Sequence, residues 1–266
     1  MTKRISLEEA VSFVRDGDVL AIGGNTLHRA PIAFVHRLIH AGTRGLEIVK
    51  TAGSYDIDVL CAAGVAAEVS AGFVGYETPF GMAPAYRRAV ETGKVLAKEH
   101  VCASVIAGLR ASLQGVSFMP MAGLTGSDLP AARGFAWLEN PYGTGRVIAI
   151  PAISPDVAII HVHEADDFGN ARILGSPFED VIMAQAAKKV VITAERVVDR
   201  LNPLEVTISG LYVDAVVEAP SGAHPLSCPD RYEWDAAWLA SWVEAAQTDE
   251  AARSFIDTRI LDQVHP

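Results

Sequence analysis

Short apolar runs alternate along the chain with longer segments in which apolar residues recur every three or four positions. The run Val19–Ile22 has the length of a buried strand, and the turn Gly23-Gly24-Asn25 follows it directly. Pro31 then stands where a first helical position is expected, ahead of the periodic segment Ile32–Ile39. This pattern predicts a strand–helix unit.

The same alternation predicts further strand–helix pairs. Strands are expected at Leu46–Val49, Glu68–Phe73 and Val95–Glu99, each followed by a helix, at Val59–Ala63, Pro84–Glu91 and Val101–Leu113. Strands that alternate with helices pair in parallel, and the crossover helices cover both faces of the sheet. The predicted fold class is therefore α/β, with a mainly parallel sheet flanked by helices.

The segment Met121–Gly145 breaks this alternation, because it is rich in glycine, proline and small polar residues. A loop of this length in a compact domain is usually functional or an interface, so we expect a lid or a subunit contact. The alternation then resumes, with strands expected at Arg146–Ile150, Val157–Val162, Lys189–Thr193 and Tyr212–Glu218 and helices at Phe178–Lys188 and Trp234–Ala246. With no repeat or linker, residues 1–266 are expected to form one domain.

The composition favours a compact protein outside the membrane. Half of the residues, 50%, are hydrophobic, and the apolar runs are shorter than the ~20 residues of a membrane span. Glu8 and Glu9 interrupt the N-terminal segment where a signal peptide needs its apolar stretch. Cys61, Cys102 and Cys228 are odd in number and match no zinc or redox spacing, which favours a reducing compartment. We therefore expect a cytoplasmic protein.

The charge balance limits the partners. The 32 acidic and 22 basic residues give a net charge of −10. This field repels nucleic acid and anionic membranes, so we expect neither as a partner. A chain of this charge binds phosphates through a local basic patch, at helix N-termini, or on another polypeptide.

The first strand ends in a possible binding turn. Gly23 and Gly24 permit positive φ and close approach of backbone N–H groups to a bound oxygen. Arg29 has a planar side chain that suits a carboxylate partner. A tight turn and a solvated arginine are simpler explanations, and these residues alone do not decide between the alternatives.

His161 and His163 lie on the same face of a predicted strand, with Asp166 and Asp167 close behind. The pattern resembles a metal site. Strand ends in α/β proteins carry polar residues for hydrogen bonding, however, and we favour that interpretation. The segment 166–170 resembles a calcium loop only in part, because it lacks the later ligands. No metal ion is predicted.

Two glutamates stand at predicted strand ends. Glu99 ends one strand, and a partly buried carboxylate at that edge has the chemistry of a nucleophile or general base. Glu77 occupies a similar edge. A solvated or salt-bridged side chain is the simpler interpretation for both.

Five segments carry a combined pattern: DGDVLAIGGNTLHRAP (16–31), SAGFVGYETPFGMAPAYRRAVETGKV (70–95), GVSFMPMAGLTGSDLP (115–130), PAISPDVAIIHVHEADDFGNARILG (151–175) and VDAVVEAPSGAHP (213–225). In residues, order and spacing they resemble the first subunit of family I CoA-transferases of the glutaconate type. The resemblance covers almost the whole chain.

The chain departs from the broader CoA-transferase signature in the first segment. Asn25 stands where that signature has phenylalanine, and Arg29 where it has a later glycine, which argues against ketoacid-type chemistry. An arginine before the Ala-Pro step is similar to glutaconate-type and steroid-ring-opening relatives. The family's catalytic glutamate belongs to the second subunit, and Glu139-Asn140, followed by Pro141, is not that motif.

The resemblance implies a reaction divided between two chains. A glutamate of the second (B, or β) subunit first attacks an acyl-CoA thioester, and CoA then passes to a carboxylic acid. Coenzyme A is a substrate, and no permanently bound cofactor is expected. This subunit is expected to hold the acyl group; the expected substrate-binding residues are Gly23, Gly24, Asn25, Arg29, Gly53, Ser54, Glu77, Gly126 and Ser127.

Two alternatives remain open. In ring-cleaving hydrolases of CoA-linked steroids the partner's nucleophile is absent, and a glutamate of this subunit, which aligns with Glu99 in AKEHVCASVIAGLRA (97–111), serves as the base. Glu99 is therefore the catalytic candidate of this chain. The other alternative is a subunit that only scaffolds or regulates its partner.

Overall fold

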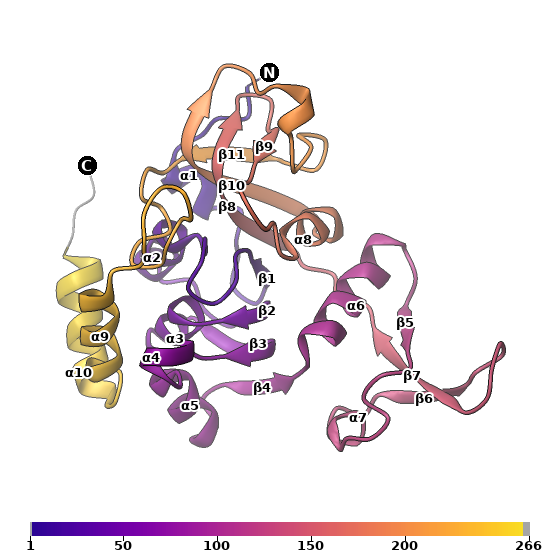
Figure 1. Ribbon diagram of the computed structural model, residues 1–266. Coiled ribbons are helices and arrows are strands. Elements are labelled where there is room, and N and C mark those ends of the chain that lie inside the picture. The colour runs from indigo at the N-terminus through magenta and orange to yellow at the C-terminus, as the bar shows by residue number, and fades with distance from the viewer. Residues whose placement is uncertain (1, 263–266) are drawn as a thin grey trace.

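The computed structural model describes residues 2–262 and is built on an eight-stranded, mainly parallel sheet (Figure 1). Its strands are β1 (Val19–Ile22), β2 (Leu46–Gly53), β3 (Ala66–Val74), β4 (Leu96–Glu99), β8 (Val157–Asp166), β9 (Ala171–Arg172), β10 (Lys189–Val198) and β11 (Ala215–Glu218). They run in the order β11-β10-β8-β1-β2-β3-β4, and β9 pairs antiparallel with β8. The other neighbouring strands pair in parallel, so the predicted α/β fold class is confirmed.

Helices cover both faces of this sheet. They are α1 (Leu7–Val11), α2 (Ile32–Ala41), α3 (Tyr55–Ala62), α4 (Glu77–Phe80), α5 (Pro84–Glu91), α6 (Cys102–Leu113), α8 (Asp180–Ala186), α9 (Ala236–Ala245) and α10 (Asp249–Ile256), with a 3₁₀ turn η1 (Pro203–Glu205) and a π-helical turn η2 (Asp257–Leu261). Strand side chains alternate between the faces. Ala21, Val49 and Ile160 pack against α6 and α8. Leu20 and Ile48 pack on the other face against α2, α3 and the C-terminal helices.

A second, smaller sheet projects from the main body (Figure 1). It contains β5 (Phe118–Met121), β6 (Ala136–Glu139) and β7 (Arg146–Pro151), antiparallel in the order β5-β7-β6, with α7 (Leu129–Ala132) between β5 and β6 in the chain. The expectation of a wholly irregular segment 121–145 is therefore wrong. The strand expected at 146–150 exists, but it belongs to this antiparallel sheet. Strands of four residues offer too few alternations for a periodic signal, which explains the difference.

Several element ends also differ from the sequence pattern. The helix expected from Phe178 begins at Asp180, because Phe178 has φ +47, which a helix does not allow. The strand expected from Tyr212 begins at Ala215. Helix α10 was not predicted, because its segment is rich in charge and buries few side chains.

The strand order creates a crevice at the end of β1. The chain passes from β1 to β2, β3 and β4 on one side, and later returns to the other side of β1 with β8. Ligands of open α/β sheets bind at the carboxyl ends of strands where the order reverses in this way. In Figure 1 the ends of β1 to β4 point toward the smaller sheet.

The helices of the described residues 2–262 are all too short or too polar to cross a bilayer.

Candidate functional site

The turn after β1 is fixed by hydrogen bonds within the chain. The backbone N–H groups of its three residues all have partners: Gly23 donates to the Ile159 carbonyl (2.8 Å), Gly24 to the Asp180 carboxylate (2.8 Å) and Asn25 to the His28 carbonyl (2.9 Å). Gly24 has φ +73, and a Cβ there would lie 2.4 Å from the His28 carbonyl oxygen, so only glycine fits. The expected role of this turn as a source of free backbone donors is therefore wrong. The turn shapes the edge instead.

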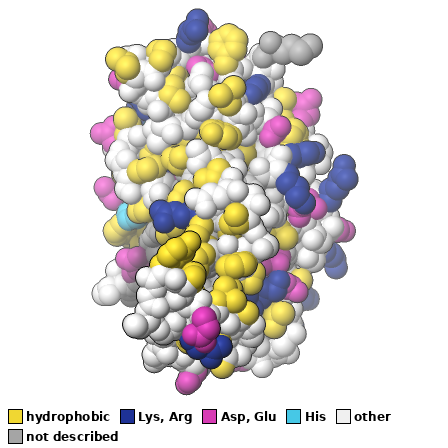
Figure 2. Space-filling model, turned by 90° about the vertical axis from the view of Figure 1, so that its right-hand side faces the viewer, with side chains coloured by type: hydrophobic (Ala, Val, Ile, Leu, Met, Phe, Trp, Pro, Cys, Tyr) yellow, Lys and Arg dark blue, Asp and Glu magenta, His cyan; other side chains and the backbone are white. Residues whose placement is uncertain are grey.

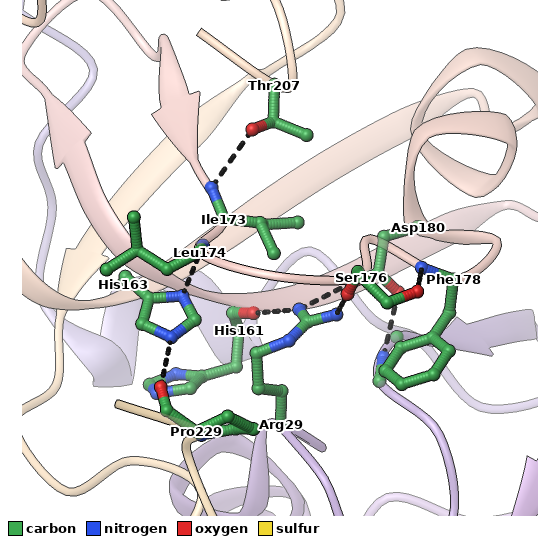
Figure 3. A network of polar contacts seen from close by, with 12 residues as sticks. Arg29, His161, His163, Ile173, Leu174, Ser176, Phe178, Asp180, Thr207 and Pro229 are labelled. Carbon is green, nitrogen blue, oxygen red and sulfur yellow. Dashed lines mark hydrogen bonds and ion pairs between the residues drawn. The ribbon is translucent and has the colours of Figure 1, made fainter. Parts of the chain in front are cut away.

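Arg29 is buried rather than open to a substrate. It is 1% exposed, and its Nη1 donates to the Asp180 carboxylate (2.7 Å) and to the His161 carbonyl (3.0 Å). Its Nη2 donates to the Ser176 carbonyl (2.9 Å), and the Phe178 ring lies 5.5 Å from the guanidinium carbon (Figure 3). The carboxylate that Arg29 was expected to find in a substrate is supplied by Asp180.

A second buried ion pair, which the sequence pattern did not predict, lies beside the same turn. Lys50 Nζ is 2.6 Å from the Asp56 carboxylate and donates to the Gly23 carbonyl at 2.8 Å, and both charged side chains are 0% exposed. Asp56 also accepts a hydrogen bond from the Ser54 backbone N–H (2.8 Å). These contacts tie the Gly53-Ser54 turn to the turn after β1. A lysine in an otherwise apolar strand was the available signal.

Glu179, which was also not predicted, is a nearly buried carboxyl group at this edge. It is 6% exposed, the Asn25 side chain hydrogen-bonds it, and its Oε1 has no hydrogen-bond partner among the described residues. Burial, and then the neighbouring Asp180 carboxylate, raise the pKa of Glu179 to about 7. The group therefore exchanges a proton near neutral pH, as acid–base groups do. Its sequence surroundings do not distinguish it from a solvated glutamate at a helix start.

Glu99 and Glu77 lie away from the turn after β1. Glu99 is exposed and ends β4, three strands from β1, which is about 14 Å at the usual strand spacing. It pairs with Ala71, whereas Gly53 pairs with Val74, so β4 ends below the level that β2 and β3 reach. Glu77 is exposed and begins α4, with φ +57. Neither glutamate belongs to the cluster around Glu179 in the described chain.

Gly126 and Ser127 lie in the smaller-sheet unit, between β5 and α7, and both are exposed. The Ser127 hydroxyl donates to the Leu124 carbonyl (3.1 Å). Their contact with a substrate stays a prediction.

His163 and Asp166 of β8 serve as hydrogen-bonding groups. His163 Nδ1 accepts from the Leu174 N–H (3.1 Å) and its Nε2 donates to the Pro229 carbonyl (2.7 Å), while burial lowers its pKa (Figure 3). Asp166 accepts from the backbone N–H (3.0 Å) and side chain (2.9 Å) of Asn170. Asp166 therefore closes its own turn.

One cluster of the described residues has spacing that suits a metal ion: ligand atoms of His161, Glu195 and Cys228 lie within 4.8 Å of one another. His161 already hydrogen-bonds Glu195 (2.8 Å) and Thr193 (2.9 Å), so both ring nitrogens are in use. Burial raises the pKa of Cys228 to about 12, which keeps its thiol protonated and makes it a poor ligand. The cluster fits a hydrogen-bond network better than a metal site.

The face toward which the strands point carries hydrophobic side chains along its middle, with most charged ones toward the margins (Figure 2). The smaller-sheet unit exposes Phe118 (39%), Leu138 (37%) and Tyr142 (97%). Exposed apolar surface of this kind marks sites of protein–protein contact.

Comparison with known proteins places this arrangement among enzymes that act on CoA esters. The family described as coenzyme A transferase matches residues 4–219. The chain is 30% identical to the first of the named chains of glutaconate CoA-transferase from Acidaminococcus fermentans, covering 98% of this chain and 89% of that one. The crystal structure of that enzyme matches with a TM-score of 0.94 at 29% identity, over 99% of this chain and 90% of that chain.

Two further relatives differ in function or length. The IpdA component of the cholesterol ring-cleaving hydrolase of Rhodococcus jostii is 33% identical, over 96% of this chain and 91% of that one. An uncharacterized protein of Archaeoglobus fulgidus is 37% identical over 96% of this chain, and this chain spans 58% of its length. That longer protein has sequence with no counterpart here.

Proposed function

This chain belongs to the coenzyme A transferase family, and we propose that it is the first subunit of an enzyme that moves CoA between an acyl-CoA thioester and a carboxylic acid. The observation that carries the proposal is the match to the first subunit of a transferase over 98% of this chain in sequence and 99% in structure. The resemblance that the five sequence segments indicated is thereby confirmed.

The transfer begins at a glutamate of the partner subunit. Its carboxylate attacks the thioester carbonyl carbon, the C–S bond breaks, and CoA leaves as a thiolate from an acyl-glutamyl anhydride. The thiolate then attacks the glutamyl carbonyl carbon, which releases the first acid as a carboxylate and leaves CoA on the glutamate. The second acid reverses these two steps, so CoA leaves on the new acyl group and the glutamate is regenerated. Each activated bond is exchanged for another, and no ATP is consumed.

This chain supplies a rigid wall for that reaction. The buried pairs Arg29–Asp180 and Lys50–Asp56 fix the turns at the ends of β1 and β2. A wall whose side chains are locked by such contacts holds an acyl group in one orientation, which lowers the entropic part of the barrier.

The partner subunit completes the site. The smaller-sheet unit projects on the side toward which the strand ends point and exposes apolar side chains (Figures 1 and 2). This arrangement supports the partner contact expected at Met121–Gly145, with Gly126 and Ser127 close to the substrate in the assembled enzyme.

A ring-cleaving hydrolase is the second candidate, because the IpdA relative is 33% identical over 91% of its length. In that case Glu99 is the catalytic base. Glu99 is exposed in this chain, so a partner has to cover it before its basicity is of use in a water-excluding site.

The test is a transfer assay on the chain purified together with its partner. An acyl-CoA donor is offered with a panel of acids, namely acetate, glutarate, glutaconate and benzoate, and both thioester and free thiol are measured. A new acyl-CoA with no net loss of thioester supports the proposal. Release of free CoA without a new thioester rejects transfer and favours the hydrolase.

A further inference from the structure

Thr51 of β2 occupies an unusual place on the face of the sheet covered by α6 and α8. The register places it opposite Gly72 of β3 and, two residues beyond the last β1 pair, beside Gly23. Neither neighbour has a side chain. Helix α6 begins over Gly72, where a Cβ would lie 2.3 Å from the Cys102 nitrogen. Helix α8 begins over Gly23, where a Cβ would lie 2.9 Å from the Asp180 carboxylate.

Two buried oxygens at this place lack a hydrogen-bond partner within residues 2–262. They are Thr51 Oγ1 and Glu179 Oε1, on side chains whose residues are 1% and 6% exposed. An unpaired buried polar group is costly, and native proteins fill such positions with an ordered water or a ligand oxygen.

Cys102 connects the two oxygens. Its Sγ donates to the Thr51 carbonyl at 3.4 Å, and burial followed by the nearby Glu179 carboxyl raises the pKa of the Cys102 thiol. Cys102 itself is exposed at the first turn of α6. The two unpaired oxygens therefore lie under a residue that reaches the surface of the crevice.

The charges around Glu179 favour a proton on it at neutral pH. Asp180 on α8 opposes its ionisation, while Lys50 on β2 and the Asn25 side chain after β1 favour it. The Lys50 ammonium already lies in a buried ion pair, as does the Asp180 carboxylate. No free cation of the described chain is therefore left to neutralise an ionised Glu179, and a protonated carboxyl is a hydrogen-bond donor.

We propose that Thr51 and Glu179 form an acyl-oxygen subsite, in which the Thr51 hydroxyl and the protonated Glu179 carboxyl donate hydrogen bonds to a carboxylate oxygen of the acid that takes part in CoA transfer. The nature of this ligand rests on the proposed transferase function. Because both oxygens are buried and Cys102 is exposed, rotation of the Cys102 side chain admits the acid. Thr51 and Glu179 are binding residues in this scheme, and the nucleophile stays on the partner.

The test measures binding rather than turnover, by calorimetry of the two-subunit protein with acetate, glutarate, glutaconate and benzoate. Thr51→Val removes one donor, so the best-binding acid is expected to bind about tenfold more weakly. The melting temperature does not fall, because valine also removes an unpaired hydroxyl. Thr193→Val is the matched control: its hydroxyl hydrogen-bonds His161 at 2.9 Å, so the melting temperature falls while acid binding stays unchanged.

The proton on Glu179 has its own readout. Ionised Glu179 loses its donor and repels a carboxylate, so the wild-type affinity is expected to fall up to about tenfold between pH 7 and pH 8. Glu179→Gln keeps an N–H donor at the same place. Its affinity at pH 6 is expected to match that of the wild type, and the fall above pH 7 disappears.

Two results would overturn the subsite. If Thr51→Val and Glu179→Gln leave acid affinity and its pH dependence unchanged, the two oxygens hold only an ordered water. A wild-type pair that binds none of the four acids has the same consequence. Failure of the transferase function is distinguishable: a pair that binds acid through Thr51 and Glu179 but makes no new acyl-CoA keeps the subsite and loses the transfer.

Discussion

Removal of the Asp180 carboxylate tests how the sheet edge is built. Asp180 is 0% exposed, and its oxygens accept from the Gly24 N–H (2.8 Å) and the Arg29 guanidinium (2.7 Å). Asp180→Ala leaves the Arg29 charge buried without its partner, which costs about 3–5 kcal/mol. The unpaired Gly24 N–H adds about 1–3 kcal/mol. The expected loss is therefore about 4–8 kcal/mol, a large part of the ~5–15 kcal/mol by which a typical domain is stable.

The assay is denaturant unfolding of the purified protein, with Glu91→Ala as the control. Glu91 pairs with Arg87 at 2.7 Å with both side chains more than half exposed, so this change is expected to cost only about 0.3–0.5 kcal/mol. The double variant Arg29→Met/Asp180→Leu should recover part of the loss, because no charge remains buried. The reasoning is refuted if Asp180→Ala is within about 1 kcal/mol of the control. A double variant less stable than Asp180→Ala would also refute it.

Three further predictions concern Glu99, Trp242 and Asp58. Glu99→Gln should lower turnover in a transferase but leave the covalent intermediate on the partner, whereas a hydrolase should lose about 10²–10⁴-fold or more in rate; steady-state kinetics of the pair distinguish these outcomes. Trp242→Phe removes the Nε1 donor that lies 2.9 Å from the buried Asp58 carboxylate, and the expected loss of about 1–3 kcal/mol is measurable by thermal unfolding. Burial raises the pKa of Asp58 to about 6, above its unfolded value, so the stability it contributes is full below about pH 4 and is lost as the pH rises through 6. Asp58→Asn should remove this part of the pH dependence, and an unchanged slope between pH 4 and pH 6 would contradict the assignment.

The parallel sheet could be predicted because its strands are continuous apolar runs and its helices have clear periodicity. Val19–Ile22 and Val157–Asp166 are almost wholly buried, so no polar residue interrupts the pattern until the strands end. The smaller sheet could not be predicted, because β5 and β6 have four residues each and bury few of them. Packing against neighbouring elements, rather than local pattern, decides such strands.

The location of the site followed from the glycine turn at the end of β1, but its chemistry did not. Arg29 and its partner Asp180 are 151 positions apart, and only the adjacency of β1 and β8 brings them together. The Lys50–Asp56 pair spans 6 positions, so a buried lysine within a strand could have revealed it. Glu179 depends on burial by elements distant in the sequence, which a single sequence does not show.

Covalent trapping tests the central claim most directly. The two-subunit protein is incubated with acyl-CoA, the enzyme-bound thioester is reduced with borohydride, and peptides of both chains are analysed by mass spectrometry. The account predicts a modified glutamate on the partner subunit, with Glu77, Glu99 and Glu179 of this chain unmodified. A modified glutamate on this chain, or full transfer activity of this chain purified alone, would contradict it.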